Sequence, residues 1–281
     1  DVAVVCVGGS SGINVEMSSP ATTGEALDRA DLGLPGRQSE LVEAVHRTGT
    51  PVVAVLINGR PLSTPWLAEN VPAVVEAWLP GEEGGNAVAE VLFGHASPGG
   101  KLPVSVPGSV GQVPIHYSRP EISLDHEHVF GDDEPLYPFG HGESYTEFDY
   151  TDLSIEPDEC APEHDVEVSV TVENVGDRAG DEVVQVYASD ESASVVRPSK
   201  QLVGFERVEL TPGEESTLTF KVPTAQLAYY DREMVPVLEP GRVKLQVGSS
   251  SQEIRLEGSF ELVGSRKQVD SRARFTTVEK E

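Results

Sequence analysis

Basic residues are scarce in this sequence. Its 281 residues include 20 Lys and Arg against 47 Asp and Glu, which gives a formal net charge of −27. Nucleic acids and anionic membrane surfaces bind proteins through Lys and Arg, so neither is a predicted partner. The acidic residues are interspersed, as at Asp190-Glu191 and Glu214-Glu215. This pattern is typical of a solvated acidic surface and favours adaptation to salt, which screens the repulsion between like charges.

Cysteines and long apolar runs are also scarce. The two cysteines, Cys6 and Cys160, do not make a disulfide framework, and Cys6 is expected in the core because it lies inside an apolar run. No run reaches the roughly 18 apolar residues of a membrane span. There is no Gly-rich phosphate loop, Ser/His/Asp order or Cys-x-x-Cys motif. The chain begins at Asp1, directly before a buried-type strand, which indicates a trimmed or fragmentary N-terminus.

Residues 1–106 alternate short apolar runs with amphipathic segments. The runs Val2–Val7, Val52–Ile57 and Val74–Trp78 are continuously apolar in character, as in parallel strands buried on both faces. Helices are expected over Gln38–Arg47 and Ala87–Phe93, and Lys101–Val106 is expected as a closing short strand. This order predicts an α/β domain with a mostly parallel sheet.

The pattern changes in the second half of the chain. Residues 107–149 are rich in Pro, Gly, His and aromatics and are expected to form a linker packed on the α/β domain, with Tyr137, Phe139 and Tyr145 pinning it there. Alternating runs such as Val166–Val172, separated by turn signals, predict an immunoglobulin-like β-sandwich over residues 150–263. Residues 264–281 are polar and are expected to form a mobile tail.

A polar loop between the first strand and the first helix carries a carboxylate and an ion pair. Glu25 is followed by Asp28 and Arg29. Open α/β sheets bind ligands beyond the carboxyl ends of their strands, where this loop is expected to lie. The loop is therefore a candidate half of an active site.

Five segments together resemble the C-terminal portion of glycoside hydrolase family 3, the β-glucosidase and β-xylosidase group. The alternating runs resemble the fibronectin type III-like domain that follows in many members, as do Arg197–Phe205 and Leu210–Gly213. Nothing in the chain corresponds to the N-terminal (β/α)8 barrel of the family. The five segments are Gly24–Arg29 with Leu34-Pro35, Leu56–Pro61, Ala77–Gly85, Gly99–Pro103, and Leu136–Gly142 with Ser144–Thr146.

The resemblance implies a retaining, exo-acting β-glucosidase that acts on short β-linked oligosaccharides or glucosides. Its nucleophilic aspartate is expected on the barrel, as another domain or chain, and its acid/base on this chain. Glu25 matches the family's acid/base position, Asp28 and Arg29 are expected to brace or bind beside it, and Glu16 is the second candidate. The isolated chain is expected to be inactive, because retaining hydrolysis needs both carboxyl groups.

Other interpretations stay open. The chain could serve as a non-catalytic structural, carbohydrate-binding or dimerisation module, including assembly into a homo-oligomer, or carry β-xylosidase or arabinosidase specificity. Asp125-His126-Glu127-His128 has metal-ligand residue types, but their spacing in a loop is unspecific, so no metal or cofactor is predicted. Glu82 and Glu83 are expected to cap the next helix, and Trp66 and Trp78 to pack in the core.

Overall fold

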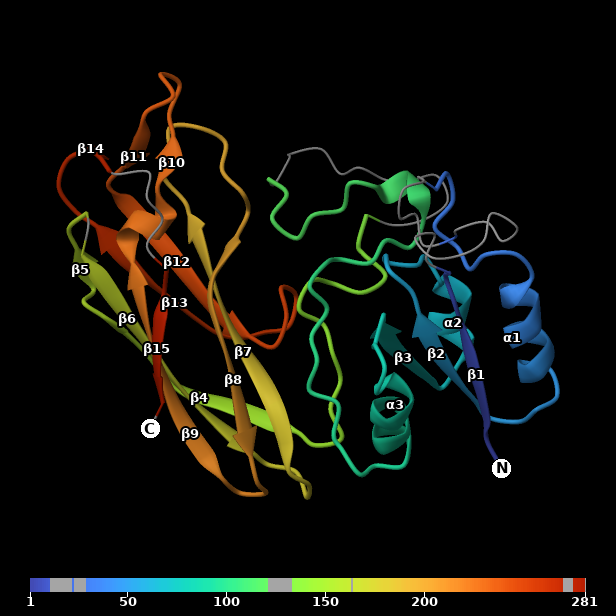
Figure 1. Ribbon diagram of the computed structural model, residues 1–281. Helices are drawn as coiled ribbons and strands as arrows, with labels where there is room; N and C mark the ends of the chain where they lie inside the picture. The colour runs from blue at the N-terminus through green and yellow to red at the C-terminus, as the bar shows by residue number, and fades with distance from the viewer. Residues whose placement is uncertain (11–21, 23–28, 121–132, 163, 270–274, 281) are drawn as a thin grey trace. The chain divides into compact units, whose positions relative to one another are not determined.

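The computed structural model describes residues 1–10, 22, 29–120, 133–162, 164–269 and 275–280 (Figure 1). The chain divides into a first, α/β unit and a second, all-β unit, which confirms the predicted fold class. Among the described residues no helix is long and apolar enough to cross a membrane. The first unit contains Asp1–His95, Val104–Ile115 and His126–Pro138, and the second contains Ala96–Pro103, His116–Asp125 and Phe139–Glu281.

The first unit is built on a parallel sheet with the strand order β1-β2-β3. All three strands are parallel to their neighbours, as the continuous apolar runs predict. Helices follow the strands in the expected alternation. The elements are β1 (Ala3–Gly8), α1 (Gln38–His46), β2 (Val52–Ile57), α2 (Pro65–Asn70), β3 (Ala73–Trp78), α3 (Gly84–Leu92) and the short 3-10 helix η1 (Val110–Gln112).

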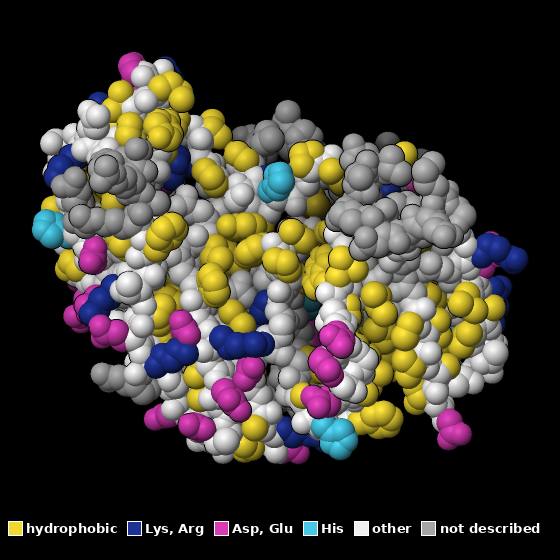
Figure 2. All heavy atoms as spheres, in the orientation of Figure 1, with side chains coloured by type: hydrophobic (Ala, Val, Ile, Leu, Met, Phe, Trp, Pro, Cys, Tyr) yellow, Lys and Arg dark blue, Asp and Glu magenta, His cyan; other side chains and the backbone are white. Residues whose placement is uncertain are grey.

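The core of the first unit lies on one face of this sheet. Val5 and Val7 of β1 pack in one buried cluster with Val42 of α1 and other apolar residues of β2 and α2. Side chains alternate along a strand, so the opposite face of β1 carries Val4, which is 50% exposed, and Cys6, which is also exposed. Figure 2 shows hydrophobic side chains gathered over β1. The prediction that Cys6 lies in the core is therefore wrong.

The prediction of a strand over residues 101–106 is also wrong. Only Val106 makes a β-bridge in this segment, to Tyr137. Pro103 and Pro107 have no N–H to donate, so a continuous ladder does not form. The contacts assign residues 104–115 to the first unit and residues 116–120 to the second, so the predicted linker is shared between them.

The second unit is a sandwich of mostly antiparallel strands, in which β5 pairs parallel with β13. One sheet has the order β5-β13-β12-β7-β8, the other has the order β15-β9-β6-β4, and a small sheet has the order β10-β11-β14. The elements are β4 (Phe148–Glu156), β5 (Glu159–Cys160), β6 (Asp165–Asn174), β7 (Gly180–Asp190), β8 (Gln201–Leu210), β9 (Glu215–Pro223), η2 (Thr224–Leu227), β10 (Tyr229–Tyr230), β11 (Pro236–Leu238), β12 (Gly241–Gly248), β13 (Ile254–Leu262), β14 (Lys267–Gln268) and β15 (Thr277–Lys280).

Strict alternation along β6 builds the sandwich core. Val166, Val168, Val170 and Val172 are all fully buried, while their neighbours face outward. Phe220 on β9 packs in the same cluster. Burying a side chain of this kind stabilises a fold by roughly 1.5–3 kcal/mol, so the period-two pattern accounts for both the strand and its burial.

Two parts of the predicted tail, residues 264–281, form β-strands. Lys267–Gln268 pairs with β11, and Thr277–Lys280 pairs with β9 at the edge of the second sheet. Thr276 donates its hydroxyl to the carbonyl of Val203 at 2.6 Å. These polar residues form edge strands because their alternate side chains can stay in solvent while the backbone pairs.

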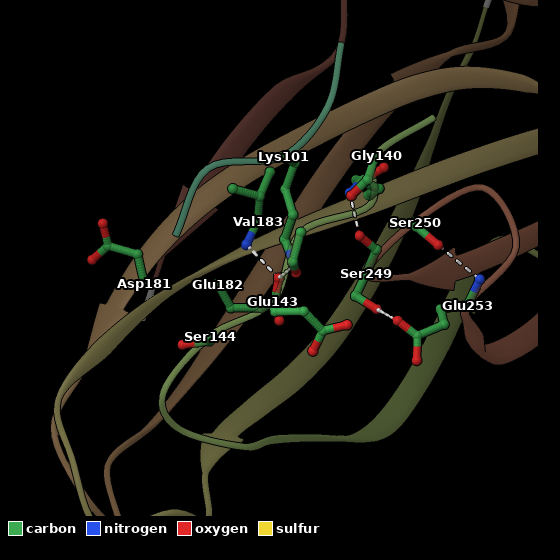
Figure 3. Close-up of polar contacts among 12 residues, drawn as sticks. Lys101, Gly140, Glu143, Ser144, Asp181, Glu182, Val183, Ser249, Ser250 and Glu253 are labelled. Carbon is green, nitrogen blue, oxygen red and sulfur yellow. Dashed lines mark hydrogen bonds and ion pairs between the residues drawn. The ribbon is translucent and has the colours of Figure 1, made fainter. Parts of the chain in front are cut away.

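Two of the five recognised segments pair with each other in the second unit. Residues 96–103 and 139–146, here called the strap, are joined by backbone bonds from Leu102 N to His141 O and from Gly140 N to Leu102 O, both 2.8 Å. Lys101 Nζ donates to Gly142 O at 2.8 Å. It also lies 3.1 Å from the buried Glu182 Oε1 on β7 (Figure 3). The strap is thus tied to the sandwich by a buried ion pair.

The strap covers one face of β7. Gln185 and Tyr187, which alternation alone would place outward, are both buried. Gln185 lies against the strap, and Tyr187 contacts the ring of Tyr117. Gln185 Nε2 donates to Gly140 O, and Gly140 has a φ of 82° and no room for a Cβ against the Gln185 amide. Phe139 stacks on Tyr117 with ring centroids 4.3 Å apart, and both belong to the second unit. The aromatic contact of Phe139 therefore lies there, and not with the α/β unit as expected.

Candidate active site

The carboxyl edge of the parallel sheet is the candidate site, because ligands of open α/β sheets bind at that edge. β1 ends at Gly8, where Gln38 of α1 closes the strand with two bonds. Its Oε1 accepts from Gly8 N at 2.6 Å, and its Nε2 donates to Gly8 O at 2.9 Å. A Cβ on Gly8 would overlap the carbonyl oxygen of Ile57 on β2. Only glycine allows the chain to leave β1 this close to β2.

The loop that follows β1 has a cross-linked stem. Ser10 N donates to Thr22 Oγ1 at 2.7 Å, and Thr22 N donates to Ser10 O at 2.9 Å. Arg29 donates to Thr22 O at 3.2 Å and to Gly33 O at 2.6 Å. One guanidinium thus links Thr22 of the stem to Gly33, with the rigid donor fork that distinguishes Arg from Lys. The chain between Ser10 and Arg29 therefore begins and ends at fixed points on this edge.

Only one of the predicted site residues lies among the residues that the structure describes. Glu25, Asp28 and Glu16 lie outside the described residues, and so does Asp125–His128. Arg29 is described, and its partners are backbone carbonyls. Among the residues that the structure describes, no group of three or more His, Cys, Asp and Glu side chains could hold a metal ion.

Glu83 and Trp66, which the sequence placed outside the catalytic site, make contacts that support the fold. Glu83 is the residue before α3, but its side chain makes no capping bond to the backbone and accepts from Asn86 Nδ2 at 2.6 Å. Trp66 packs against the core cluster of the first unit, with its ring edge-to-face on His46 at 5.4 Å. The core position expected for Trp66 fits these contacts.

The sequence interpretation missed a half-buried carboxyl group at this edge. Glu76 on β3 lies beside Asn58, which follows β2 and is fully buried. Glu76 Oε1 accepts from Trp78 N at 3.0 Å, and Asn58 Nδ2 is 3.5 Å from Glu76 Oε2. Burial raises the pKa of Glu76 to about 7, against the opposing effect of these two hydrogen bonds. A lone Glu inside the apolar run Val74–Trp78 was the available signal.

The turn after β3 is strained. Trp78 has a φ of 51°, a left-handed conformation that costs a residue with a Cβ roughly 1–2 kcal/mol. The pairing of β2 with β3 shifts register between Leu56 and Ile57, immediately before it. Trp78 O accepts from Asn58 N at 3.0 Å. Strain of this kind persists only where surrounding contacts hold it, and Glu76 and Asn58 supply them here.

Comparisons with known proteins show the family to which the chain belongs. Residues 1–145 match the model of the glycosyl hydrolase family 3 C-terminal domain, and residues 182–251 match the fibronectin type III-like domain. The chain belongs to glycosyl hydrolase family 3. The resemblance carried by the five segments is thereby confirmed.

Individual relatives agree with this assignment. A beta-xylosidase of Formosa agariphila is 48% identical over 237 residues, which are 83% of this chain and 33% of the relative. A periplasmic beta-glucosidase of Salmonella typhimurium is 40% identical over 94% of this chain and 34% of its own length. A solved beta-glucosidase of Erythrobacter marinus has a TM-score of 0.85 at 43% identity, over 94% of this chain and 34% of that one. The chain spans about a third of the length of these family 3 relatives.

Proposed function

We propose that this chain is the acid/base-bearing part of a retaining, exo-acting β-glucosidase, which removes terminal β-linked glucose from short oligosaccharides or glucosides. Glu25 is the acid/base, and the nucleophilic aspartate lies on a (β/α)8 barrel outside this chain. The cross-linked stem at Ser10, Thr22 and Arg29 supports this proposal, because these described residues precede and follow Glu25 in the chain and lie beyond the carboxyl end of β1, where open α/β sheets bind ligands. Membership of family 3 and the beta-glucosidases among its relatives support it.

The chemistry assigns two successive tasks to Glu25. It protonates the glycosidic oxygen while the nucleophile attacks the anomeric carbon, and it then removes a proton from the water that releases the sugar. The two carboxyl groups must lie about 5–5.5 Å apart. The acid step requires a pKa raised from about 4.3 toward about 6, which burial against the barrel would supply. Arg29 acts as the brace of the loop through its backbone bonds, and its pairing with Asp28 is part of the proposal.

The test uses the complete enzyme, with this chain and its barrel. Glu25→Ala should slow hydrolysis of a β-glucoside with a poor leaving group about 10²–10⁴-fold, the usual contribution of a general acid. A substrate with a good leaving group should lose much less, and azide should restore turnover by forming a glycosyl azide. Glu16→Ala is the matched control and should keep its rate. If Glu25→Ala hydrolyses both substrates at the unchanged rate, the assignment is wrong, and a loss in Glu16→Ala would move it there.

A β-xylosidase is the second candidate, favoured by the 48% identity to the beta-xylosidase of Formosa agariphila. The ratio of kcat/KM for an aryl β-glucoside and an aryl β-xyloside decides between them in the complete enzyme. The isolated chain should hydrolyse neither, because the nucleophile is elsewhere. Turnover by the isolated chain would contradict the division of the two carboxyl groups. Absence of turnover in the complete enzyme would favour the non-catalytic module.

A further inference from the structure

The half-buried Glu76 and the buried Asn58 form a pair at the sheet edge that carries the proposed acid/base loop, yet the proposed chemistry does not use this pair. Side chains alternate along β3, so Glu76 shares the face of Val74, which packs on the buried core. Its pair partner across the sheet is Leu56 of β2, also in that core. Placing a carboxyl group in such surroundings costs folding free energy unless hydrogen bonds compensate for the lost solvation.

We propose that Glu76 is a positioning residue, whose carboxylate holds the left-handed turn at Trp78 and so fixes where residues 78–83 leave the catalytic edge. The carboxylate joins the Trp78 amide to the side chain of Asn58, while the Asn58 backbone binds the Trp78 carbonyl. Both peptide groups of the strained residue are thus held from neighbouring positions. Neighbouring strands lie about 4.8 Å apart, so β3 ends two strand spacings from the stem after β1.

Protonation changes these contacts. Ionised Glu76 accepts from the Trp78 amide and from the Asn58 side chain, whereas protonation makes one carboxyl oxygen a donor and weakens the group as an acceptor. Burial raises the pKa of Glu76 to about 7, so this change falls near neutral pH. The charged groups on the elements around it are Arg60 after Asn58, Glu69 on α2, and Glu82 and Glu83 before α3. None of them contributes to the shift in the pKa of Glu76.

The first experiment reads the turn without using activity. Trp66→Phe in the 281-residue chain leaves Trp78 as the sole tryptophan and removes the ring that contacts the titratable His46. Trp78 emission should then titrate with a midpoint near pH 7, and Glu76→Gln should abolish that transition. Glu69→Gln, an exposed acid on α2, is the matched control and should keep it. An unchanged transition in Glu76→Gln would overturn the proposal.

If the Trp66→Phe chain does not fold, a second measurement tests the same contact with both tryptophans in place. With 5-fluorotryptophan in the otherwise unmodified chain, two ¹⁹F resonances are expected, one for each tryptophan. Glu76→Gln should remove the titration of one and leave the other. Two unaffected resonances would overturn the proposal.

The kinetic experiment uses the complete enzyme, and its interpretation rests on the proposed function of this edge. Gln presents a donor to Asn58 at every pH, so Glu76→Gln should lose about tenfold in kcat above neutral pH, with KM changed less than twofold. In the plot of kcat against pH, the change with a midpoint near pH 7 on the acid side should disappear in Glu76→Gln. A wild-type pH profile and kcat in Glu76→Gln would overturn the role in turnover. Failure of the proposed function would appear differently, as an unmodified enzyme that hydrolyses no β-glycoside.

Discussion

Replacement of Lys101 by Met tests the buried ion pair that ties the strap to the sandwich. The side chains of Lys101 and Glu182 are 12% and 7% exposed, and Glu182 Oε1 also accepts from Val183 N at 2.7 Å. Met keeps the aliphatic volume of Lys101 but removes the charge and the bond to the Gly142 carbonyl. Glu182 would then lack its cationic partner in the protein interior and keep the bond from Val183 N.

The expected loss is large because the two charges compensate each other. Removing one partner of a buried pair costs about 3–5 kcal/mol, whereas replacing both by apolar groups of similar volume is close to neutral. The double variant Lys101→Met/Glu182→Met should therefore lose only about 2 kcal/mol, the usual contribution of the two hydrogen bonds that it gives up, from Val183 N and to Gly142 O. Each single variant should be less stable than the double variant.

Urea unfolding with two probes measures this effect. Trp66 and Trp78 are the only tryptophans and both lie in the first unit, so tryptophan fluorescence reports that unit. Strands β4 to β15 all lie in the second unit, so far-UV circular dichroism reports mainly the sandwich. Lys101→Met should lower the midpoint of the dichroism transition and leave the fluorescence transition in place. Separate transitions are expected because the two units have separate cores.

The neighbouring pair of Arg207 and Asp181 provides the matched control. Its atoms are 3.2 Å apart, but the side chains are 55% and 31% exposed, so Arg207→Met should cost less than about 1 kcal/mol. A loss in Lys101→Met as small as that of the control would refute the reasoning. So would a double variant whose loss equals the sum of the two single losses, because the charges would then be independent.

Three further predictions concern the cores and the candidate site. Phe220→Ala, at a fully buried position, should cost about 3–5 kcal/mol in the dichroism transition alone, and a loss confined to the fluorescence transition would contradict the separate cores. Burial raises the pKa of Glu76 from 4.5 to about 7, so its contribution to stability is fully present below pH 4.5 and is lost as pH rises through 7. In urea unfolding, Glu76→Gln should therefore be more stable than the wild type by about 2 kcal/mol near pH 8, after a discount for partial exposure, and match it near pH 4. Equal stabilities at both pH values would contradict the raised pKa of Glu76. Arg29→Ala, which removes the bonds to Thr22 and Gly33, should lower kcat in the complete enzyme and leave the circular dichroism unchanged. The kcat of Arg29→Lys should lie between those of Arg29→Ala and the wild type. A wild-type kcat in Arg29→Ala would exclude the bracing role.

Periodicity predicted the two architectures because each kind of strand has one dominant environment. The continuous runs at β1, β2 and β3 form the parallel sheet, and the alternating run at β6 forms a strand with one buried face. β7 shows where this reasoning fails. Gln185 and Tyr187 are polar enough to indicate an outer face, but both are buried. The strap supplies the carbonyl of Gly140 to Gln185, and Tyr117 packs on Tyr187. Such a contact joins residues 45 positions apart and leaves no local pattern.

Apolarity alone also overestimated burial at Cys6. A continuous apolar strand needs a layer on each face, and the described contacts place α1 and α2 on the face of Val5 and Val7. Cys6 lies on the opposite face and is exposed. The strand was predicted correctly from its composition, but the burial of each side chain depends on which face the helices cover.

The acid/base assignment depends on the family, whereas the position of Glu76 could have been read from the residues. Many acids occur in polar loops of this chain, so Glu25 has no local feature that separates it from Glu16. Glu76 instead interrupts Val74–Trp78, where a charged side chain must have a partner or lose its charge. Its partner Asn58 follows the next strand of the sheet, and parallel strands end at the same edge. A polar residue inside a buried strand therefore indicates a hydrogen-bonded pair at that edge, and the strained conformation of Trp78 is what this pair holds.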